Sequence, residues 1–551
     1  MTNLVEIRDL TIDARTDSGR VVEIIRGISL DVREGEMLAL IGESGSGKTT
    51  VALALLGHAR PGCRFTGGTV TLDGREMTGM PEDRRAALRG TLVAYVPQSA
   101  AAAFNPARRI IDQLVEVVAI HENVPREVAR ARALELIRAL GLPEPERIGL
   151  RYPHQVSGGQ LQRLAAVMAL IGRPKLVIFD EPTTALDVTT QIEVLRAFKR
   201  VMREQGITGV YVSHDLAVVA QMADRIAVLR DGAVQETGET AQILHNPQHP
   251  YTQQLLHAFS PSDYVPPVMA EAPPQVLLQA EITAGYGPRN AAGEPAIRVL
   301  DQVSITLAKG RTLGIVGESG CGKSTLARAL SGILPLSRGQ IQFDGKRLAP
   351  AMRQRSKHDL QRMQIVFQLA DTAINPRKRV ADIIGRPLTF YQGLKGAAWE
   401  ARVDALLDMV HLPRALKHRL PGELSGGQKQ RVNLARALAA EPSLILCDEI
   451  TSALDAVVAD AIIDLLRELR RRLDLSFIFI SHDLATVQSL CDEIIVMYKG
   501  QKVEEMQPVS LGGAPRQPYS QLLFASTPTL DPGWLDGLEG NEAFQKAFAG
   551  R

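Results

Sequence analysis

Short runs of apolar residues recur along the chain, and each is followed by glycine or by polar residues. The runs are MLALI (Met37–Ile41), TLGIV (Thr312–Val316), LVIF (Leu176–Phe179), LILC (Leu444–Cys447), GVYV (Gly209–Val212) and SFIFI (Ser476–Ile480). Their length and their β-branched and apolar content suit strands buried on both faces, as in a parallel sheet covered by helices. Because polar residues follow these strands, the pattern predicts a functional edge at the carboxyl ends of a mostly parallel sheet.

Two longer segments have helical periodicity, Glu127–Gly141 and Ala398–Val410. They predict a separate helical lobe in each half of the chain. No apolar run reaches the roughly 18 residues that a membrane-spanning helix needs. The amino terminus, MTNLVEIRDL, lacks the basic-then-apolar form of a signal peptide. We therefore expect the chain to stay in the cytosol, so that any action at a membrane requires other subunits that span it.

The chain contains one series of motifs twice. GESGSGKT (Gly42–Thr49) returns as GESGCGKS (Gly317–Ser324), and the segments VSGGQLQR, LVIFDE and VSHDLA return 268 residues later in nearly the same form. Such ordered repetition indicates a tandem duplication, which explains 551 residues better than three or four unrelated domains. A Pro-rich stretch between the copies predicts a first domain at 1–262, a linker at 263–275 and a second domain with a carboxyl-terminal extension at 276–551.

Composition narrows the choice of function. The 63 basic and 61 acidic residues leave a net charge of +2, which argues against a protein that wraps DNA with a strongly basic surface. A hydrophobic share of 45% fits ordinary α/β domains. The four cysteines, Cys63, Cys321, Cys447 and Cys491, have neither metal-ligand nor redox spacing. We interpret them as structural or incidental.

The two glycine-rich segments have the residues that cradle a phosphate. Glycines let successive backbone N–H groups turn inward, and the helix that follows presents its positive N-terminal end. Lys48 and Lys323 would then pair with β- and γ-phosphate oxygens, and the hydroxyls of Thr49 and Ser324 would bind Mg²⁺. A glycine-rich turn without a ligand is the alternative, and it is weakened by two copies that each follow an apolar run.

Paired acids follow the LVIF and LILC strands. Asp180 and Asp448 suit the Mg²⁺ shell, while Glu181 and Glu449 can orient or deprotonate the attacking water. A pair of solvated loop acids is the plainer interpretation, but two occurrences directly after apolar strands disfavour it. His214 and His482 each follow the first acid by 34 residues, and this matched spacing favours a γ-phosphate contact over a structural histidine.

The SGGQ segments begin at Ser157 and Ser425. Each serine can cap a helix, and the glycines after it allow a phosphate to approach the helix end. Taken alone, SGGQ fits a simple capped helix start equally well. Its meaning depends on the motifs around it.

Together these motifs resemble those of the ATP-binding cassette (ABC) family, over nearly the whole chain. Gln98 and Gln368 match the family's Q-loop glutamine, and TALD (Thr184–Asp187) and SALD (Ser452–Asp455) match its D-loop. The resemblance implies two tandem P-loop α/β domains, each with a RecA-like core, a helical subdomain and an antiparallel β lobe. It also implies ATP hydrolysis with Mg²⁺ at two head-to-tail sites, one pairing Lys48 with Ser425 and the other pairing Lys323 with Ser157.

The resemblance also assigns a set of site residues. Catalytic roles fall to Glu181, Glu449, His214 and His482, and metal contacts to Thr49, Gln98, Asp180, Ser324, Gln368 and Asp448. The nucleotide contacts carried over are Gly42, Ser44, Gly45, Gly47, Lys48, Thr49, Thr50, Gln98, Ser157, Gly158, Gly159, Gln160, Asp180, Tyr286, Gly317, Ser319, Gly320, Gly322, Lys323, Ser324, Thr325, Gln368, Ser425, Gly426, Gly427, Gln428 and Asp448.

Further segments are similar to those of the peptide/nickel importer group: HPYTQQLL (His249–Leu256), QPYSQLL (Gln517–Leu523), FNPAR (Phe104–Arg108) and INPRK (Ile374–Lys378). This implies a subunit at the cytoplasmic side of a bacterial inner membrane that drives two permease subunits fed by an extracytoplasmic binding protein. Peptides or related small solutes are the implied cargo. One chain would supply both cassettes, and no nucleic acid would be involved.

Some positions depart from the family pattern. Tyr286 stands where the family stacks an aromatic ring on adenine, whereas the first copy has Ala14. Val156 replaces the Leu that usually precedes SGGQ, the signature segment of the family. Ile450 replaces the Pro that follows the paired acids in the family's DEPT sequence. Some relatives carry a cysteine-ligated iron–sulfur cluster, but His245–Pro274 and Glu504–Arg551 contain no cysteine, so we expect none.

Two other functions stay open. A soluble tandem cassette acting on ribosomes or nucleic acid is one, although the short Pro-rich linker and the lack of zinc-ligand spacing disfavour it. The double cassette of a sugar or metal importer is the other, although the intact second phosphate loop disfavours a sugar importer. The family resemblance leaves the cargo unidentified, because cargo is selected by the binding protein and the permeases.

Overall fold

The computed structural model describes residues 2–15, 19–122, 124–184, 186–259, 275–291, 293–452 and 454–538. The chain divides into two compact units: the first comprises Met1–Ser260 and Pro528–Glu542, and the second comprises Pro261–Thr527 and Ala543–Arg551. Most of the expected linker at 263–275 lies outside the described residues. Among those described, no helix combines the length and the apolar character needed to cross a bilayer.

The first unit contains two sheets. The six-stranded sheet has the order β10 (Ala233–Glu239), β9 (Arg225–Arg230), β3 (Met37–Ile41), β8 (Thr208–Val212), β7 (Leu176–Asp180) and β6 (Val93–Val96). All neighbours in it are parallel except the β9–β10 pair. The second sheet is antiparallel, with the order β2 (Val21–Arg33), β1 (Asn3–Arg15), β4 (Cys63–Leu72) and β5 (Arg75–Glu76).

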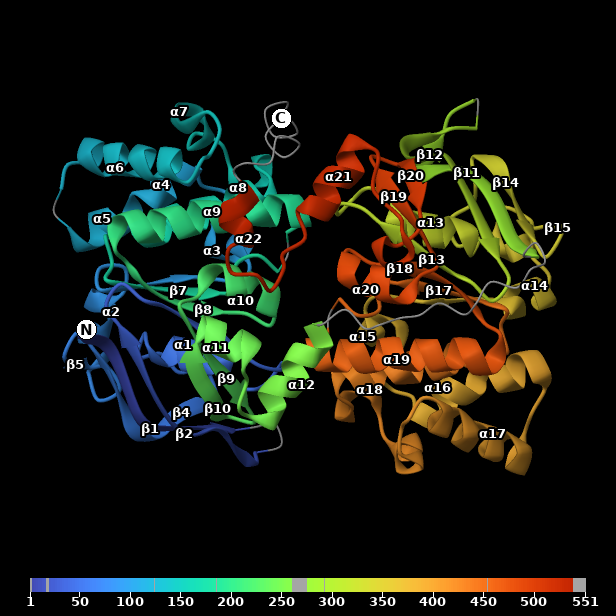
Figure 1. The fold of residues 1–551 in the computed structure, drawn as a ribbon, viewed down its shortest axis with the longest axis horizontal. Helices are drawn as coiled ribbons and strands as arrows, with labels where there is room; N and C mark the ends of the chain where they lie inside the picture. The colour runs from blue at the N-terminus through green and yellow to red at the C-terminus, as the bar shows by residue number, and fades with distance from the viewer. Residues whose placement is uncertain are drawn as a thin grey trace. The chain divides into compact units, whose positions relative to one another are not determined.

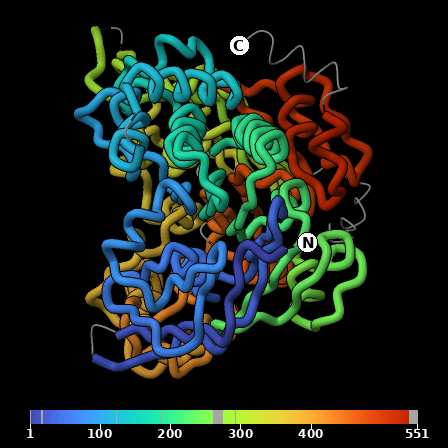
Figure 2. Tube along the Cα trace, turned by 90° about the vertical axis from the view of Figure 1, so that its left-hand side faces the viewer, coloured from blue at the N-terminus to red at the C-terminus, as the bar shows by residue number. Residues whose placement is uncertain are grey.

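The helices of the first unit fall into two groups. Those that flank the sheets are α1 (Lys48–Ala54), α2 (Glu82–Leu88), α9 (Val188–Gln205), α10 (Leu216–Met222), α11 (Thr240–His245), α12 (Pro250–Phe259) and α22 (Trp534–Gly537). Those of the helical subdomain are α3 (Ala100–Ala103), α4 (Ile110–Leu114), α5 (Glu116–His121), α6 (Arg126–Ala139), α7 (Pro145–Ile148) and α8 (Gly158–Leu170). Within this unit, the helical subdomain and the antiparallel sheet lie at opposite ends (Figures 1 and 2).

The second unit repeats this plan. Its sheets have the orders β16 (Met363–Val366), β17 (Leu444–Asp448), β18 (Ser476–Ile480), β13 (Thr312–Val316), β19 (Glu493–Tyr498), β20 (Gln501–Met506), and β12 (Pro295–Ala308), β11 (Val276–Arg289), β14 (Arg338–Phe343), β15 (Lys346–Arg347). Its helices are α13 (Lys323–Leu330), α14 (Lys357–Arg362), α15 (Ala370–Ala373), α16 (Val380–Pro387), α17 (Gly396–Met409), α18 (Gly426–Leu438), α19 (Ala456–Leu473), α20 (Leu484–Leu490) and α21 (Pro518–Ala525). The expected fold is confirmed in both halves.

The short apolar runs became strands because both of their faces are covered. Every residue of β3, β7 and β8 is buried. In β7, Ile178 joins a core shared with the antiparallel sheet and α1. The next residue, Phe179, points to the other face, where its ring lies 5.1 Å from that of Phe198 in α9. Alternate residues thus serve two cores, which explains why the runs read as continuous apolar sequence.

The first unit includes a stretch from the carboxyl-terminal extension. Gln221 of α10 is 2% exposed, and its side-chain amide donates to the carbonyl oxygens of Thr529 (2.8 Å) and Asp531 (2.7 Å). Its side-chain oxygen accepts the backbone N–H of Leu535 at 2.9 Å. The sequence assigned 528–538 to the second domain, but its buried contacts group it with the first unit.

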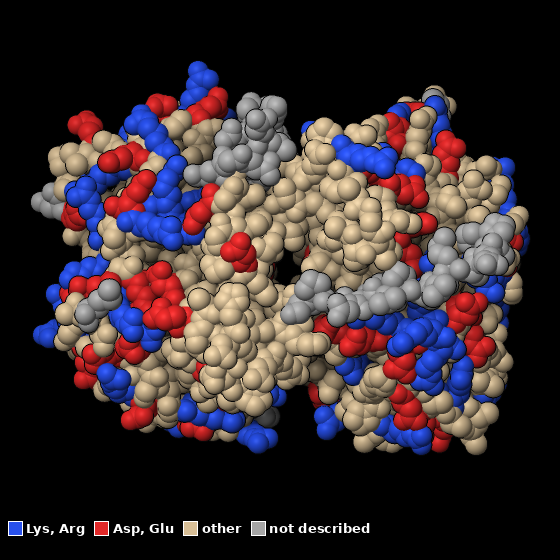
Figure 3. Space-filling view, in the orientation of Figure 1, with Lys and Arg blue, Asp and Glu red and all other residues tan. Residues whose placement is uncertain are grey.

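Charge gathers beside this stretch. Lys199 of α9 pairs with Asp536 of α22 at 3.0 Å. A cavity of about 550 Å³ lies next to this pair, and its basic lining residues include Arg196, Arg200 and Arg203. Figure 3 shows Lys and Arg side chains collected over α9. The first unit therefore holds the stretch by buried hydrogen bonds and by opposite charge.

Candidate nucleotide sites

Each phosphate loop joins a buried central strand to a helix. Gly42 and Gly317 adopt φ of 145° and 150°, and Gly47 and Gly322 cap the helices with φ of 100° and 107°. A Cβ added at Gly42 would lie 2.0 Å from the carbonyl oxygen of Leu229. Glycine is therefore required at this bend both by conformation and by space.

Each loop lysine turns back onto the backbone of its own phosphate loop. Lys48 Nζ donates to the carbonyl oxygens of Gly42 (2.7 Å) and Glu43 (2.8 Å), and Lys48 is 6% exposed. Lys323 Nζ makes the same contacts with Gly317 (2.8 Å) and Glu318 (3.0 Å). Each ammonium group is thus held inside its own loop, on the side where the helix begins.

The first acid of each pair meets the hydroxyl that follows the lysine. Thr49 Oγ1 donates to Asp180 Oδ1 at 3.0 Å, and Ser324 Oγ donates to Asp448 Oδ1 at 2.8 Å. Burial raises the pKa of the Asp448 carboxyl, against the hydrogen bond from Ser324. In both units, a carboxylate at the end of a strand and a hydroxyl in the first helical turn form one oxygen-rich corner, which suits a hard divalent cation.

The second acid is the centre of a polar cluster in each unit. In the first, Gln98 Nε2 donates to Glu181 Oε2 at 3.0 Å, and His214 Nδ1 lies 3.1 Å from Glu181 Oε1. In the second, Gln368 Nε2 donates to Glu449 Oε2 at 2.8 Å, and His482 Nδ1 lies 3.7 Å from the same oxygen. The structure therefore brings together the glutamine, the acid and the histidine of each unit, although the glutamine and the histidine lie more than 110 residues apart in the sequence.

Electrostatics keep these acids ionised. Burial works against the Glu181 carboxylate, but the hydrogen bond and charge of His214 and the charge of Lys48 together lower the pKa of Glu181. The hydrogen bond to Glu181 raises the pKa of His214. The nearby imidazole of His482 is the main cause that lowers the pKa of Glu449. A carboxylate kept charged beside a phosphate site can hold a water molecule or accept its proton.

Both acids also have unusual backbone conformations. Glu181 and Glu449 adopt φ of 48° and 49°, in the left-handed region that residues other than glycine rarely occupy. Such strain persists where the surroundings impose it, and it commonly marks functional positions. In both units, the backbone therefore turns sharply at the end of the strand, between the first and the second acid.

The signature serines cap helices in both units. Ser157 Oγ accepts the backbone N–H of Gln160 at 3.3 Å, and the side chain of Gln160 accepts the N–H of Ser157 at 3.1 Å. Ser425 and Gln428 form the same reciprocal pair at the start of α18. Both serines are exposed within their own units. The capped helix start is therefore present, and its exposed end leaves the hydroxyl accessible to a ligand.

The two glycines of each SGGQ signature have different surroundings. A Cβ on Gly159 would lie 2.1 Å from Thr190 Cγ2, and one on Gly427 would lie 2.4 Å from Val458 Cγ1. The second glycine of each signature therefore lets α8 or α18 pack closely on the following helix. Gly158 and Gly426 have open surroundings by comparison, so they are the glycines free to face a phosphate.

Tyr286 lies beside the second phosphate loop. Its hydroxyl is 3.3 Å from Thr325 Oγ1, and the residue is 37% exposed. In the first unit, Ala14 pairs with Val22 as Tyr286 pairs with Ile297, so the strand registers support the sequence alignment of the two positions. An exposed ring near the loop suits stacking on adenine, and the first unit has no aromatic side chain at this position.

Sequence reasoning missed three kinds of supporting residue. Tyr95 donates its hydroxyl hydrogen to Asp180 Oδ2 at 2.7 Å, but it lies on strand β6 and is not repeated in the second copy, so no signal marked it. Tyr251 and Tyr519 reach the backbone of the phosphate loops. Both belong to the repeated HPYT and QPYS segments, and that repetition was the available signal.

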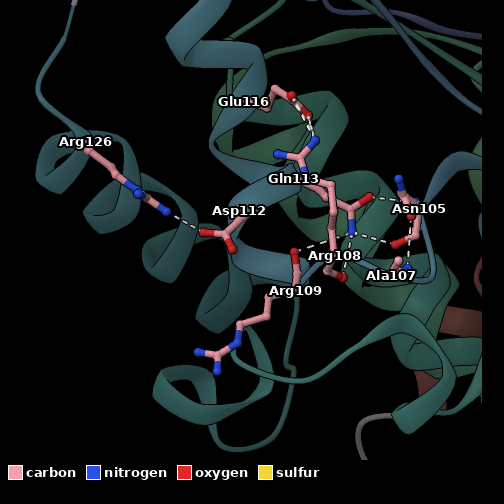
Figure 4. A network of polar contacts seen from close by, with 8 residues as sticks. All are labelled: Asn105, Ala107, Arg108, Arg109, Asp112, Gln113, Glu116 and Arg126. Atoms are coloured by element: carbon pink, nitrogen blue, oxygen red, sulfur yellow. Dashed lines mark hydrogen bonds and ion pairs between the residues drawn. The ribbon is translucent and has the colours of Figure 1, made fainter.

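Gln113 is the third kind, and it organises the loop after Gln98 (Figure 4). Its side-chain oxygen accepts the backbone N–H of Asn105 at 2.7 Å. Its amide donates to the carbonyl oxygens of Asn105 (3.1 Å), Arg108 (3.1 Å) and Arg109 (3.4 Å). Ion pairs of Arg108 with Glu116 and of Arg126 with Asp112 hold the surrounding helices. One buried side chain thus fixes the backbone of the FNPAR segment.

Comparison with known proteins agrees with this geometry. The family model "ABC transporter" matches residues 25–184 and 300–452, and the model "Oligopeptide/dipeptide transporter, C-terminal region" matches 235–279 and 503–550. The chain is 37% identical to a peptidoglycan transport ATP-binding protein YejF of Agrobacterium fabrum, over 95% of this chain and 96% of that protein.

It is also 36% identical to the glutathione import ATP-binding protein GsiA of Escherichia coli, over 96% of this chain and 90% of that protein. An uncharacterized ABC transporter ATP-binding protein, YejF of Escherichia coli, is 36% identical over 95% of this chain and 99% of its own length. The expected ATPase activity and the repeat of two cassettes are thereby confirmed. With two phosphate loops, two acid clusters and two signatures on one fold, the chain belongs to the ABC transporter family as an ATP-hydrolysing protein with two cassettes.

Proposed function

We propose that the chain is the ATP-hydrolysing subunit of a bacterial importer of peptides or related small solutes. One observation carries this proposal: each cassette is followed by its own oligopeptide/dipeptide-type carboxyl-terminal region, at 235–279 and 503–550. Relatives named for glutathione import and for peptidoglycan transport support the same class of cargo. Two permeases and an extracytoplasmic binding protein would complete the transporter, with this chain bound at the cytoplasmic face of the inner membrane.

The site geometry supports specific roles. Lys48 and Lys323 would contact the β- and γ-phosphates, Glu181 and Glu449 would activate water, and His214 and His482 would contact the γ-phosphate. Following the family pattern, we propose that the exposed Ser425 and Ser157 act on the nucleotide bound by the other cassette's loop. Tyr286 would stack on adenine at the Lys323 loop.

Mg²⁺ fits the oxygen-rich corner of each unit. Thr49 and Asp180, with Gln98, would hold it in the first cassette, and Ser324 and Asp448, with Gln368, would hold it in the second. The ion would neutralise phosphate charge, while the protein residues orient it. We also propose domain limits of 1–262 and 276–551, joined by a linker at 263–275, with 528–538 of the second domain's carboxyl-terminal extension packed on the first domain.

The test is purification of the chain from detergent-solubilised membranes. Two membrane proteins should accompany it, and the ATPase activity of the complex in vesicles should rise when a binding protein loaded with glutathione or a short peptide is added. The same binding protein without cargo is the control. Co-purification with ribosomes in place of membrane proteins, or stimulation by sugars but not by peptides, would contradict the proposal.

A further inference from the structure

The carboxyl-terminal region of each cassette places one tyrosine hydroxyl on its own phosphate loop. The backbone N–H of Glu43 donates to the hydroxyl of Tyr251 at 3.2 Å. The N–H of Glu318 donates to the hydroxyl of Tyr519 at 3.1 Å. The contact therefore occurs at equivalent atoms in both cassettes. The HPYT and QPYS segments that supply it lie outside the motifs assigned to ATP binding and hydrolysis.

The same peptide group also holds the loop lysine. The Glu43 N–H and the Gly42 carbonyl belong to one planar peptide, and that carbonyl accepts Lys48 Nζ at 2.7 Å. In the second cassette, the Gly317 carbonyl accepts Lys323 Nζ at 2.8 Å. A hydroxyl that fixes the N–H therefore also fixes the direction of the carbonyl and the place of the ammonium group. The glycine in this peptide gives it little rigidity of its own.

The first tyrosine is firmly seated. Tyr251 is 2% exposed, and the guanidinium carbon of Arg230, at the end of β9, lies 4.7 Å from its ring centre. The turn before it is anchored by Glu236, whose carboxylate accepts the backbone N–H groups of Gln248 (2.9 Å) and His249 (3.0 Å). Burial is the main cause that raises the pKa of Tyr251 well above its usual range, so the hydroxyl keeps its proton.

The second tyrosine is seated by equivalent contacts. Its ring centre lies 4.3 Å from that of Tyr498, at the end of β19. Glu504 accepts the backbone N–H groups of Arg516 (2.8 Å) and Gln517 (3.1 Å), as Glu236 does for the first turn. Helices α12 and α21 are thus fixed at their N-terminal ends, and each carries its tyrosine to the loop.

We propose that Tyr251 and Tyr519 are positioning residues that hold the Gly–Glu peptide of each phosphate loop, and through it the loop lysine, in the arrangement that receives ATP. The hydroxyl reduces the ordering that binding must otherwise supply, so it raises nucleotide affinity without touching the reacting atoms. Nucleotide affinity then depends on the placement of α12 and α21, which connects the oligopeptide-type region to the ATP site.

The test removes both hydroxyls and keeps both rings, as Tyr251→Phe with Tyr519→Phe in the full chain. Loss of one neutral hydrogen bond at each site should weaken binding of a fluorescent ATP analogue about two- to tenfold. The KM for ATP should rise by a similar factor while kcat changes less. Tyr498→Phe is the matched control, because it keeps the ring that packs on Tyr519 and removes a hydroxyl that forms no hydrogen bond with the phosphate loop in the described part of the chain. It should leave the affinity unchanged.

Hydrogen exchange provides a second measurement. The amides of Glu43 and Glu318 should exchange faster in the double variant than in the wild type, because each loses its acceptor. Unchanged affinity and unchanged exchange in the double variant, or an equal loss of affinity in Tyr498→Phe, would overturn the proposal. These measurements need no permease and no cargo, so their outcome is independent of the proposed import function.

Discussion

The two cassettes share the lysine, the paired acids, the glutamine and the histidine that we propose to act on ATP, but they differ in the residues that support these groups. Asp180 accepts hydrogen bonds from both Thr49 and Tyr95, whereas Asp448 accepts one from Ser324 and has Ile365 at the position of Tyr95. Duplication has preserved these groups, while their supports and the proposed adenine position, Ala14 or Tyr286, have diverged.

The loops that follow the Q-loop glutamines show the same divergence. Gln113 fixes the FNPAR backbone with four hydrogen bonds, while the equivalent position in the second cassette is Ile383, which joins an apolar core. There the Asn375 side chain still accepts the N–H of Arg377 at 3.0 Å, as that of Asn105 does for Ala107. The turn is common to both copies, but a buried polar clamp supports it in the first alone.

The third difference concerns the carboxyl-terminal stretch. The first cassette binds it through Gln221 and Lys199. The equivalent residues of the second cassette are Ser489 and Arg467, and Arg467 donates instead to the Ser489 carbonyl oxygen at 2.8 Å. At the equivalent positions, the second cassette therefore makes a hydrogen bond within its own unit.

The largest effect on ATP turnover is expected from the second acids, Glu181 and Glu449, which are the same in both cassettes. Glu181→Gln with Glu449→Gln should lower ATP turnover by roughly 100-fold or more, because general base catalysis contributes on that order. ATP binding should persist, since the amide keeps the shape of the side chain. Turnover and nucleotide binding are measured on the same sample, with Glu441→Gln, an exposed acid outside both sites, as the control. Normal turnover in the double variant would show that these acids are not the bases.

Removing the Gln221 side chain that binds the carboxyl-terminal stretch is expected to have the next largest effect. Gln221→Ala should weaken docking of 528–538 by about 1–3 kcal/mol, because it leaves two carbonyls and one N–H without their buried partner. Trp534 lies in this stretch, so its fluorescence and the rate of proteolysis there report docking. Ser489→Ala is the matched substitution in the second cassette. Equal effects of the two variants would remove the distinction between the cassettes.

Tyr95→Phe tests the extra support of Asp180. In a Glu449→Gln background, which leaves the first base intact, loss of this hydrogen bond to a carboxylate should lower turnover roughly tenfold. In a Glu181→Gln background, where the second base remains, the same change should have little effect. Steady-state ATPase assays separate the two cases. A similar loss in both backgrounds would mean that Tyr95 acts through the general stability of the chain.

The smallest expected effect is on stability as a function of pH. The pKa of His214 is raised by Glu181, so the stability from this pair is fully present below the unfolded-state histidine pKa of about 6.5 and is lost as pH rises through the folded value. The pKa of Glu181 is lowered, so its contribution is present above about pH 4.3 and is lost as pH falls through the folded value.

The melting temperature should therefore fall between pH 6 and pH 8 in the wild type, and the fall should be smaller in His214→Gln. His482→Gln should change the profile less, because its Nδ1 lies 3.7 Å from the carboxylate compared with 3.1 Å for His214. Thermal unfolding at both pH values gives the comparison. An identical profile in the wild type and in His214→Gln would refute the link between this pair and stability.

Much of this architecture could be predicted from local sequence. The periodicity of Glu127–Gly141 predicted helix α6 (Arg126–Ala139), and that of Ala398–Val410 predicted helix α17 (Gly396–Met409). Tyr95 and Gln221 could not be found in this way, because their partners lie 85 residues or more away and neither residue is repeated in the other copy. A residue whose role depends on one long-range contact produces neither a periodic nor a repeated pattern in the sequence.

The sequence by itself determined the duplication, the strands and the chemistry of the nucleotide sites, because glycine spacing, apolar runs and repeated motifs are local properties. Tertiary structure decided which residues support that chemistry. It placed Tyr251 and Tyr519 on the phosphate loops and Gln113 inside the FNPAR loop. It also grouped 528–538 with the first unit. Each of these contacts pairs a buried polar group with a partner from another segment of the chain. The pairing is fixed only when distant segments pack together.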